Sequence, residues 1–109
     1  MVKSMFVYNT NKEGGFFMTH IVFFKLKDYS KENQEKVAQI LNKMQGKIDY
    51  VHEMEVGIDF LHSDRSFDLA LIVRLDKKDL DTYQVNELHC ACKKEFAPYI
   101  EYSKTVDFE

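Results

Sequence analysis

The sequence has few cysteines and no long apolar segment, and both absences limit what the chain can be. Its two cysteines, Cys90 and Cys92, are too few and too close together for a disulfide scaffold, which favours a reducing, cytoplasmic setting. No apolar run approaches the ~20 residues that a membrane-spanning helix needs. The polar stretch Asn9–Gly15 also interrupts the N-terminus where a secretory signal would stay apolar. We therefore expect no membrane association.

The chain also lacks the charge balance and the motifs of several functional classes. The 15 basic and 18 acidic residues give a net charge of -3, so a basic surface for nucleic-acid phosphates is not expected. There is no glycine-rich phosphate loop, nucleophile elbow or catalytic pair of carboxylates. The remaining composition, 45% hydrophobic over 109 residues, is typical of one globular domain.

The first 17 residues differ in texture from the rest, and they leave two interpretations open. The short apolar run Met5–Tyr8 is followed by the turn-rich stretch Asn9–Gly15. Residues 1–17 are either an extension placed before an ancestral start at Met18, or a hairpin that lengthens the first strand. We expect the domain itself to span residues 18–109.

Beyond this region, the spacing of apolar residues predicts four strands and two helices. Four segments are the expected strands: His20–Lys27, Glu53–Phe60, Phe67–Leu75 and Tyr99–Phe108. Residues of opposite faces alternate most clearly in the second and third of these segments. The helical spacing of Val37, Leu41 and Met44 predicts a first helix, which begins after Ser30 and ends near Gly46.

A second helix is expected between Asp76, as its cap, and Pro98, which stops it. Leu88, Cys92 and Phe96 follow one another at intervals of four on its buried stripe. The resulting order, β-α-β-β-α-β, is that of the ferredoxin-like α+β fold. In this fold two helices cover one face of a four-stranded antiparallel sheet.

The other face of the sheet needs an explanation, because two helices cover only one. Alternation places a mixture of apolar and charged residues on this uncovered face: Ile21, Phe23, Lys25, Glu55, Asp59, Asp68, Ala70, Ile72 and Arg74. An antiparallel sheet tolerates a solvated face. Phe23 and Ile72 exposed together would nevertheless be unusual on a monomer. The face is therefore either solvated or the interface of a homodimer, and we favour the homodimer.

Four segments of the predicted strands resemble a known family. Met18–Lys27, Glu55–Asp59, Arg65–Ile72 and Val106–Glu109 are similar, in this order, to the strands of the stress-responsive A/B barrel (Dabb) family. The resemblance covers residues 18–109 and implies a dimeric α/β barrel, in which the sheets of two protomers face one another. It implies little about activity, because one fold hosts many functions.

One branch of this family is enzymatic and closes a polyketide chain by aldol-type condensation. The catalytic tyrosine and histidine of that branch resemble Tyr83 and His89, which are six residues apart in both, and its strand histidine resembles His20. The family's usual His-Pro-x-His segment stands here as Asn86-Glu-Leu-His89, without the first histidine and the proline. The resemblance therefore implies no role that needs both histidines.

The spacing of residues also groups these side chains around one expected pocket. His89 lies on or beside the buried stripe of the second helix, and His20 points from the first strand toward the helices. A histidine can act as a general base near neutral pH, and Tyr83 can donate a hydrogen bond to a developing enolate. Phe24 and Phe96 would make the pocket apolar, which suits a small aromatic or polyketide-like ligand. The alternative is a filled core in which these residues only pack.

No residue pattern indicates a metal or a cofactor. Cys90 and Cys92 diverge by about 200° around a helix, so one regular helix cannot direct both at one ion. We expect Cys92 to pack as a small hydrophobe and Cys90 to be more exposed. The sequence thus leaves two functional hypotheses. The first is a homodimer that binds a small apolar molecule. The second is a cofactor-free cyclase- or lyase-like enzyme, in which His89 is the base and Tyr83 the hydrogen-bond donor.

Overall fold

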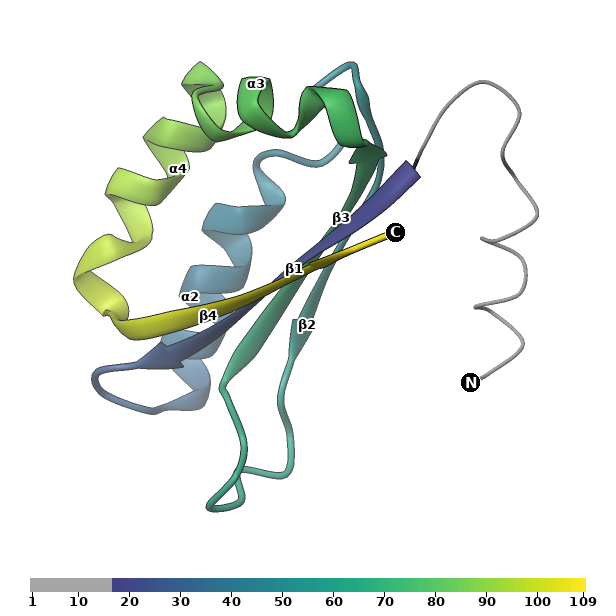
Figure 1. The fold of residues 1–109 in the computed structure, drawn as a ribbon. Helices are drawn as coiled ribbons and strands as arrows, with labels where there is room; N and C mark the ends of the chain where they lie inside the picture. Colours follow the sequence, from purple (N-terminus) through teal and green to yellow (C-terminus); the bar gives the residue numbers. More distant parts are fainter. Residues whose placement is uncertain (1–16) are drawn as a thin grey trace.

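The protein is a ferredoxin-like α+β domain in a computed structural model that describes residues 17–109. The elements, in chain order, are β1 (Phe17–Leu26), α2 (Lys31–Asn42), β2 (Val51–Ile58), β3 (Leu69–Asp76), a 3-10 turn (Lys77–Asp79), α3 (Leu80–Gln84), α4 (Glu87–Phe96), a second 3-10 turn (Ala97–Tyr99) and β4 (Ile100–Phe108). The strands form one antiparallel sheet in the order β2-β3-β1-β4. The helices all lie on one side of this sheet (Figure 1). The predicted fold is confirmed. The two interpretations of residues 1–17 depend on residues 1–16, which lie outside the described residues.

Helix α2 begins where its sequence indicates. The Ser30 hydroxyl accepts a hydrogen bond from the backbone N–H of Asn33 at 3.0 Å, which caps the first turn. The predicted stripe is buried against the sheet, with Val37 and Leu41 fully excluded from solvent. After the helix, Gly46 adopts a positive φ of 70°, a conformation that glycine enters without steric cost. Local propensity and tertiary packing therefore agree along this segment.

The second helical region differs from the prediction in two respects. Asp76 ends β3, and its side chain makes no capping hydrogen bond. The region is also interrupted at Val85 and Asn86, which separate α3 from α4. The Asn86 side chain accepts a hydrogen bond from the backbone N–H of His89 at 2.9 Å and starts α4 afresh. Asparagine competes well for such backbone donors, which is why it favours a new helix start over a continuous helix.

The strand register sorts side chains onto two faces. His20 lies opposite Asp107, and Phe24 lies opposite Ser103, on the face that the helices cover. The intervening residues of the strands form the other face, which we call the open face: Ile21, Phe23 and Lys25 from β1, Ala70, Ile72 and Arg74 from β3, Glu55 from β2, and Tyr102, Lys104, Val106 and Phe108 from β4. The predicted facing of β1 is thus confirmed.

Two residues of the connection between β2 and β3 lie elsewhere than predicted. The prediction that Asp68 belongs to the uncovered face is wrong, because its side chain is fully buried. β3 begins at Leu69, two residues after the predicted start, and the Asp68 carboxylate turns inward to accept a hydrogen bond from the backbone N–H of Leu26 at 2.8 Å. Phe60 lies beyond the end of β2 and is 92% exposed, so the alternation of the sequence runs two residues past the strand.

The core lies between the helices and the covered face of the sheet. Its members include Leu26, Leu41, Val73, Leu75 and Cys92. Cys92 is buried and Cys90 is only partly so, as the sequence predicts. No helix within residues 17–109 is long and apolar enough to cross a membrane.

The buried hydrogen bond of Asp68 leads to a testable prediction about stability. Asp68→Ala leaves the buried N–H of Leu26 without its acceptor, so we expect the free energy of unfolding to fall by about 1–3 kcal/mol in urea denaturation. Asp64→Ala, in the exposed part of the same connection, is the matched control and should change it by less than about 0.5 kcal/mol. Equal effects of the two substitutions would show that the buried hydrogen bond contributes nothing.

Candidate functional site

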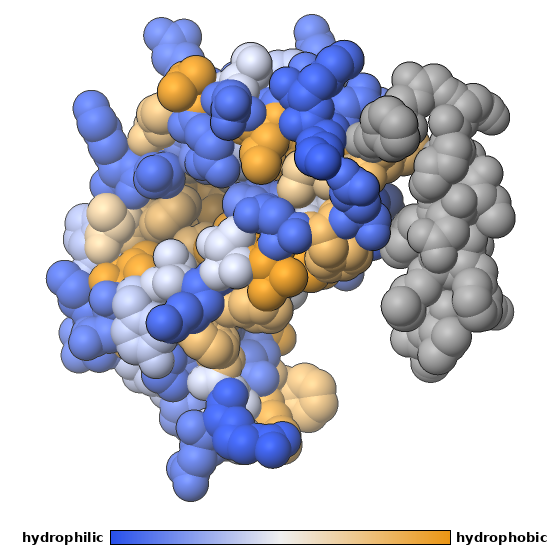
Figure 2. Space-filling model, in the orientation of Figure 1, coloured by the Kyte–Doolittle hydropathy of each residue, from blue (hydrophilic) through white to orange (hydrophobic). Residues whose placement is uncertain are grey.

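A cavity of about 230 Å³ lies between the covered face of the sheet and helix α4. Figure 2 shows it as a hollow with an apolar floor between α4 and β4. Six apolar side chains line it: Val22, Phe24, Leu41, Met44, Leu71 and Phe96. Seven polar side chains complete the lining: His20, Gln84, His89, Lys93, Ser103, Thr105 and Asp107. The polar groups come from four elements of the fold, so the folded chain is required to bring them together.

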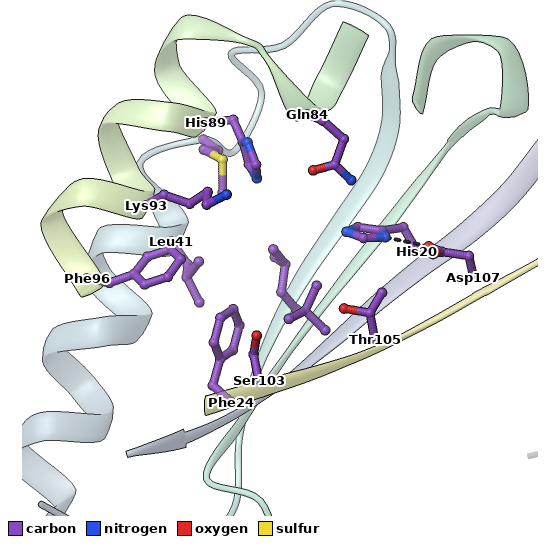
Figure 3. A pocket seen from close by; sticks show the side chains of 13 residues that line it. His20, Phe24, Leu41, Gln84, His89, Lys93, Phe96, Ser103, Thr105 and Asp107 are labelled. Atoms are coloured by element: carbon purple, nitrogen blue, oxygen red, sulfur yellow. Dashed lines mark hydrogen bonds and ion pairs between the residues drawn. The ribbon is translucent and has the colours of Figure 1, made fainter. Parts of the chain in front are cut away.

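His20 and Asp107 form the most closely coupled polar pair in this cavity. The two residues are direct partners across β1 and β4, and His20 Nδ1 lies 2.5 Å from a carboxylate oxygen of Asp107. The histidine is buried, whereas the carboxylate is partly exposed at the cavity wall (Figure 3). A carboxylate on Nδ1 fixes the imidazole tautomer, so that the other ring nitrogen is left as a hydrogen-bond acceptor. This is the arrangement that a histidine base requires.

His89 approaches the same cavity from the first turn of α4. The Asn86 side-chain oxygen accepts a hydrogen bond from the His89 backbone N–H at 2.9 Å. The interruption between α3 and α4 therefore sets the direction of the imidazole. Burial, and to a lesser extent the nearby Lys93 ammonium, lowers the pKa of the His89 imidazole. Its Nδ1 atom is buried and has no hydrogen-bond partner within the described chain. The His89 imidazole is therefore uncharged at neutral pH.

Tyr83 lies between the two histidines rather than in the cavity itself. Its ring centroid is 5.9 Å from that of His20 and 4.4 Å from that of His89. The side chain is fully buried, and burial raises the pKa of its phenol. The phenol therefore stays protonated at physiological pH. Tyr83 is not among the residues that line the cavity, and its ring contacts both imidazoles.

The sequence anticipates part of this site and misses the rest. His20, Phe24, His89 and Phe96 all line the one cavity, and Tyr83 contacts both of the histidines. Asp107 was not singled out, nor were four other polar lining residues: Gln84, Lys93, Ser103 and Thr105. The sequence of β4 contains a signal for the cavity. Ser103, Thr105 and Asp107 are short polar residues at every second position, on the face that the helices cover. Without the register, however, their partners on β1 cannot be read.

Metal binding finds no support among residues 17–109, where no cluster of three or more His, Cys, Asp or Glu side chains could hold an ion. The site is instead a cavity with an apolar floor, a His–Asp pair and several unpaired donors. Such an arrangement can bind a small molecule, orient it and exchange a proton with it.

A four-stranded sheet with helices on one face and a partly polar cavity beneath them defines a small ferredoxin-like α+β domain. The family model of the Stress responsive A/B Barrel Domain, Dabb, matches residues 18–109, and the chain belongs to that family. The resemblance seen in the strands is thereby confirmed. A comparison with curated proteins found no match.

Similar solved structures share this fold over nearly their whole length. A protein from Bacteroides fragilis, described as dimeric, ferredoxin-like and of unknown function, is 27% identical, with a TM-score of 0.72 over 85% of this chain and 95% of its own. A dimeric ferredoxin-like protein from Thermobifida fusca is 24% identical, with a TM-score of 0.77 over 91% of this chain and 95% of its own. A hydroxynitrile lyase from Passiflora edulis is 17% identical, with a TM-score of 0.69 over 85% and 92%. The last two likenesses show the fold alone.

Proposed function

We propose that this protein binds a small, largely apolar molecule in the cavity between α4 and the sheet. The observation that carries the proposal is the cavity itself, whose apolar floor includes Phe24 and Phe96 and whose wall holds His20 and His89. An apolar cavity of about 150 Å³ is large enough to bind benzene. A volume of about 230 Å³ therefore suits a ligand with one ring or a short chain and a polar end.

We also propose that the chain is a homodimer whose protomers meet through the open face. Tyr102, Val106 and Phe108 are each about half exposed there, at 47%, 50% and 46%. Phe67 contacts both Phe23 and Tyr102, with ring centroids 5.7 and 5.9 Å apart, so the aromatic surface is continuous. A second copy would remove this surface from water. The Bacteroides fragilis relative is itself described as dimeric.

The Arg74 charge on the open face is compatible with such an interface, because it already has partners. Arg74 forms an ion pair with Glu53 at 3.1 Å and donates a hydrogen bond to the Thr19 hydroxyl at 2.7 Å. Burying a charge is less costly when it is already paired.

For the cellular setting we propose the cytoplasm. The free cysteines Cys90 and Cys92 support this proposal, because thiols stay reduced there.

The His20–Asp107 pair favours a second candidate function, which is cofactor-free general base catalysis. In this proposal His20 removes a proton from carbon next to a ligand carbonyl, and Asp107 stabilises the resulting imidazolium. His89 is the alternative base that the sequence favours. Its environment instead suits it to accept or donate a hydrogen bond in the neutral form. Tyr83 would hold both imidazoles in place. The Passiflora edulis protein illustrates that a lyase can be built on this fold.

The binding proposal predicts a ligand-dependent rise in thermal stability. A ligand present at 100 times its Kd stabilises the folded state by about 2.7 kcal/mol, which is roughly 10–20 °C in Tm for a domain of this size. We expect this shift from small aromatic or alkyl compounds in a thermal-shift screen. It should be lost in Ser103→Phe, which fills the cavity, and kept in Lys94→Phe, because Lys94 does not line it. A shift that survives Ser103→Phe would place the site elsewhere.

The catalytic proposal predicts hydrogen exchange in a bound carbonyl compound. A compound that binds should lose its α-proton signal in D₂O by NMR, and His20→Gln should slow this loss at least about 100-fold. Asp107→Asn should slow it while leaving binding in place. His62→Asn, which changes an exposed histidine outside the cavity, serves as the control. Unchanged exchange in His20→Gln would remove His20 from the base role.

The dimer proposal predicts that sedimentation velocity at micromolar concentration gives twice the mass of a single chain. Val106→Lys places a charge on the β4 part of the open face and should yield a folded monomer. Val85→Lys changes a 75% exposed valine between α3 and α4, and this variant should remain dimeric. A monomeric parent protein at this concentration would contradict the proposal.

A further inference from the structure

We infer that the ligand of the cavity is an anion with an apolar body, such as a carboxylate, and that Lys93 is the residue that selects it. This inference rests on the proposed binding function and names the class of ligand. It also assigns a role to a side chain that the proposed base chemistry does not use.

The Lys93 side chain is directed at the cavity from the last turn of α4. Figure 3 shows its ammonium beneath His89 and above the apolar side chains Leu41 and Phe96. Lysine at the end of a helix also interacts favourably with the helix dipole, and Lys94 occupies the same turn. Lys94 interacts with the same dipole but does not line the cavity. The helix dipole therefore does not explain why Lys93 lines the cavity.

No carboxylate within residues 17–109 forms an ion pair with Lys93. Glu95, on the same helix, is held by Lys43 at 2.9 Å. Asp107, which supplies the carboxylate of the cavity wall, is engaged by His20. Lys93 is exposed to solvent, so its charge lies at the rim of the cavity, where no carboxylate of the described chain pairs with it.

The groups around Lys93 are also suited to an anion. Gln84, Ser103 and Thr105 line the cavity, and their side chains donate no hydrogen bond within the described chain. The Lys93 ammonium disfavours the protonated form of His89, so His89 stays neutral and Lys93 supplies the positive charge that a bound anion would meet. Hydrogen bonds to an ionised acceptor are roughly twice as strong as neutral ones. A carboxylate at this end would leave its apolar body against Phe24 and Phe96.

A matched pair of probes tests the inference. We would measure binding of 3-phenylpropanoate and of its neutral isostere 3-phenylpropanamide by titration calorimetry to the full chain. The carboxylate should bind about tenfold more tightly than the amide, or about 1.4 kcal/mol, since hydrogen bonds to an ionised acceptor are roughly twice as strong as those to a neutral one. Lys93→Met keeps the aliphatic stem and should abolish this preference while leaving amide binding unchanged. Lys93→Arg should restore it, and Lys94→Met, with the same change in net charge, should have no effect.

The outcomes separate this inference from the function on which it rests. Equal affinity for the two probes would overturn the inference and leave the binding proposal standing. A preference for the carboxylate that persists in Lys93→Met would overturn the role of Lys93. Binding of neither probe would contradict both proposals. Each variant is checked by its unfolding midpoint, and the conservative Lys93→Arg substitution distinguishes loss of charge from loss of structure.

Discussion

The pairing of β1 with β4 is the interaction on which the rest of the structure depends. It joins the beginning of the described chain to its end, because Thr19 lies opposite Phe108 and His20 lies opposite Asp107. The pairing completes the sheet and aligns two polar residues that are 87 positions apart in the chain. It also forms one wall of the cavity. A shift of this register by one residue would turn the Asp107 carboxylate to the open face and leave His20 without its partner.

The helical side contributes the second half of the site through an interruption. Because Asn86 starts α4 anew, Tyr83 and His89 belong to different helices and yet have rings only 4.4 Å apart. The interruption between α3 and α4 removes some helical hydrogen bonds, and His89 and Lys93 of α4 line the cavity above the sheet. The polar groups of the cavity are thus positioned by one strand pairing and one helix cap.

Much of the fold and part of the site could be predicted from the sequence. The helical stripe of Val37 and Leu41, the Ser30 cap and the facing of β1 are local properties, because they depend on residues a few positions apart. Asp68 was misassigned since alternation cannot show where a strand begins, and a carboxylate is not expected to be buried. Asp107 was missed because its significance depends on strand register, which is a tertiary property. The cavity is likewise a result of packing between α4 and the sheet.

Strand β4 is an edge strand in which successive side chains serve different surroundings. Ser103, Thr105 and Asp107 face the cavity, whereas Tyr102, Lys104, Val106 and Phe108 face away from it. In the proposed assembly one set meets the ligand and the other meets the second protomer. Substitutions in the two sets are separated by the backbone, so ligand preference and partner preference can diverge independently among related proteins. Alternate positions of this nine-residue strand would then change under two different selective pressures, one from the ligand and one from the second protomer.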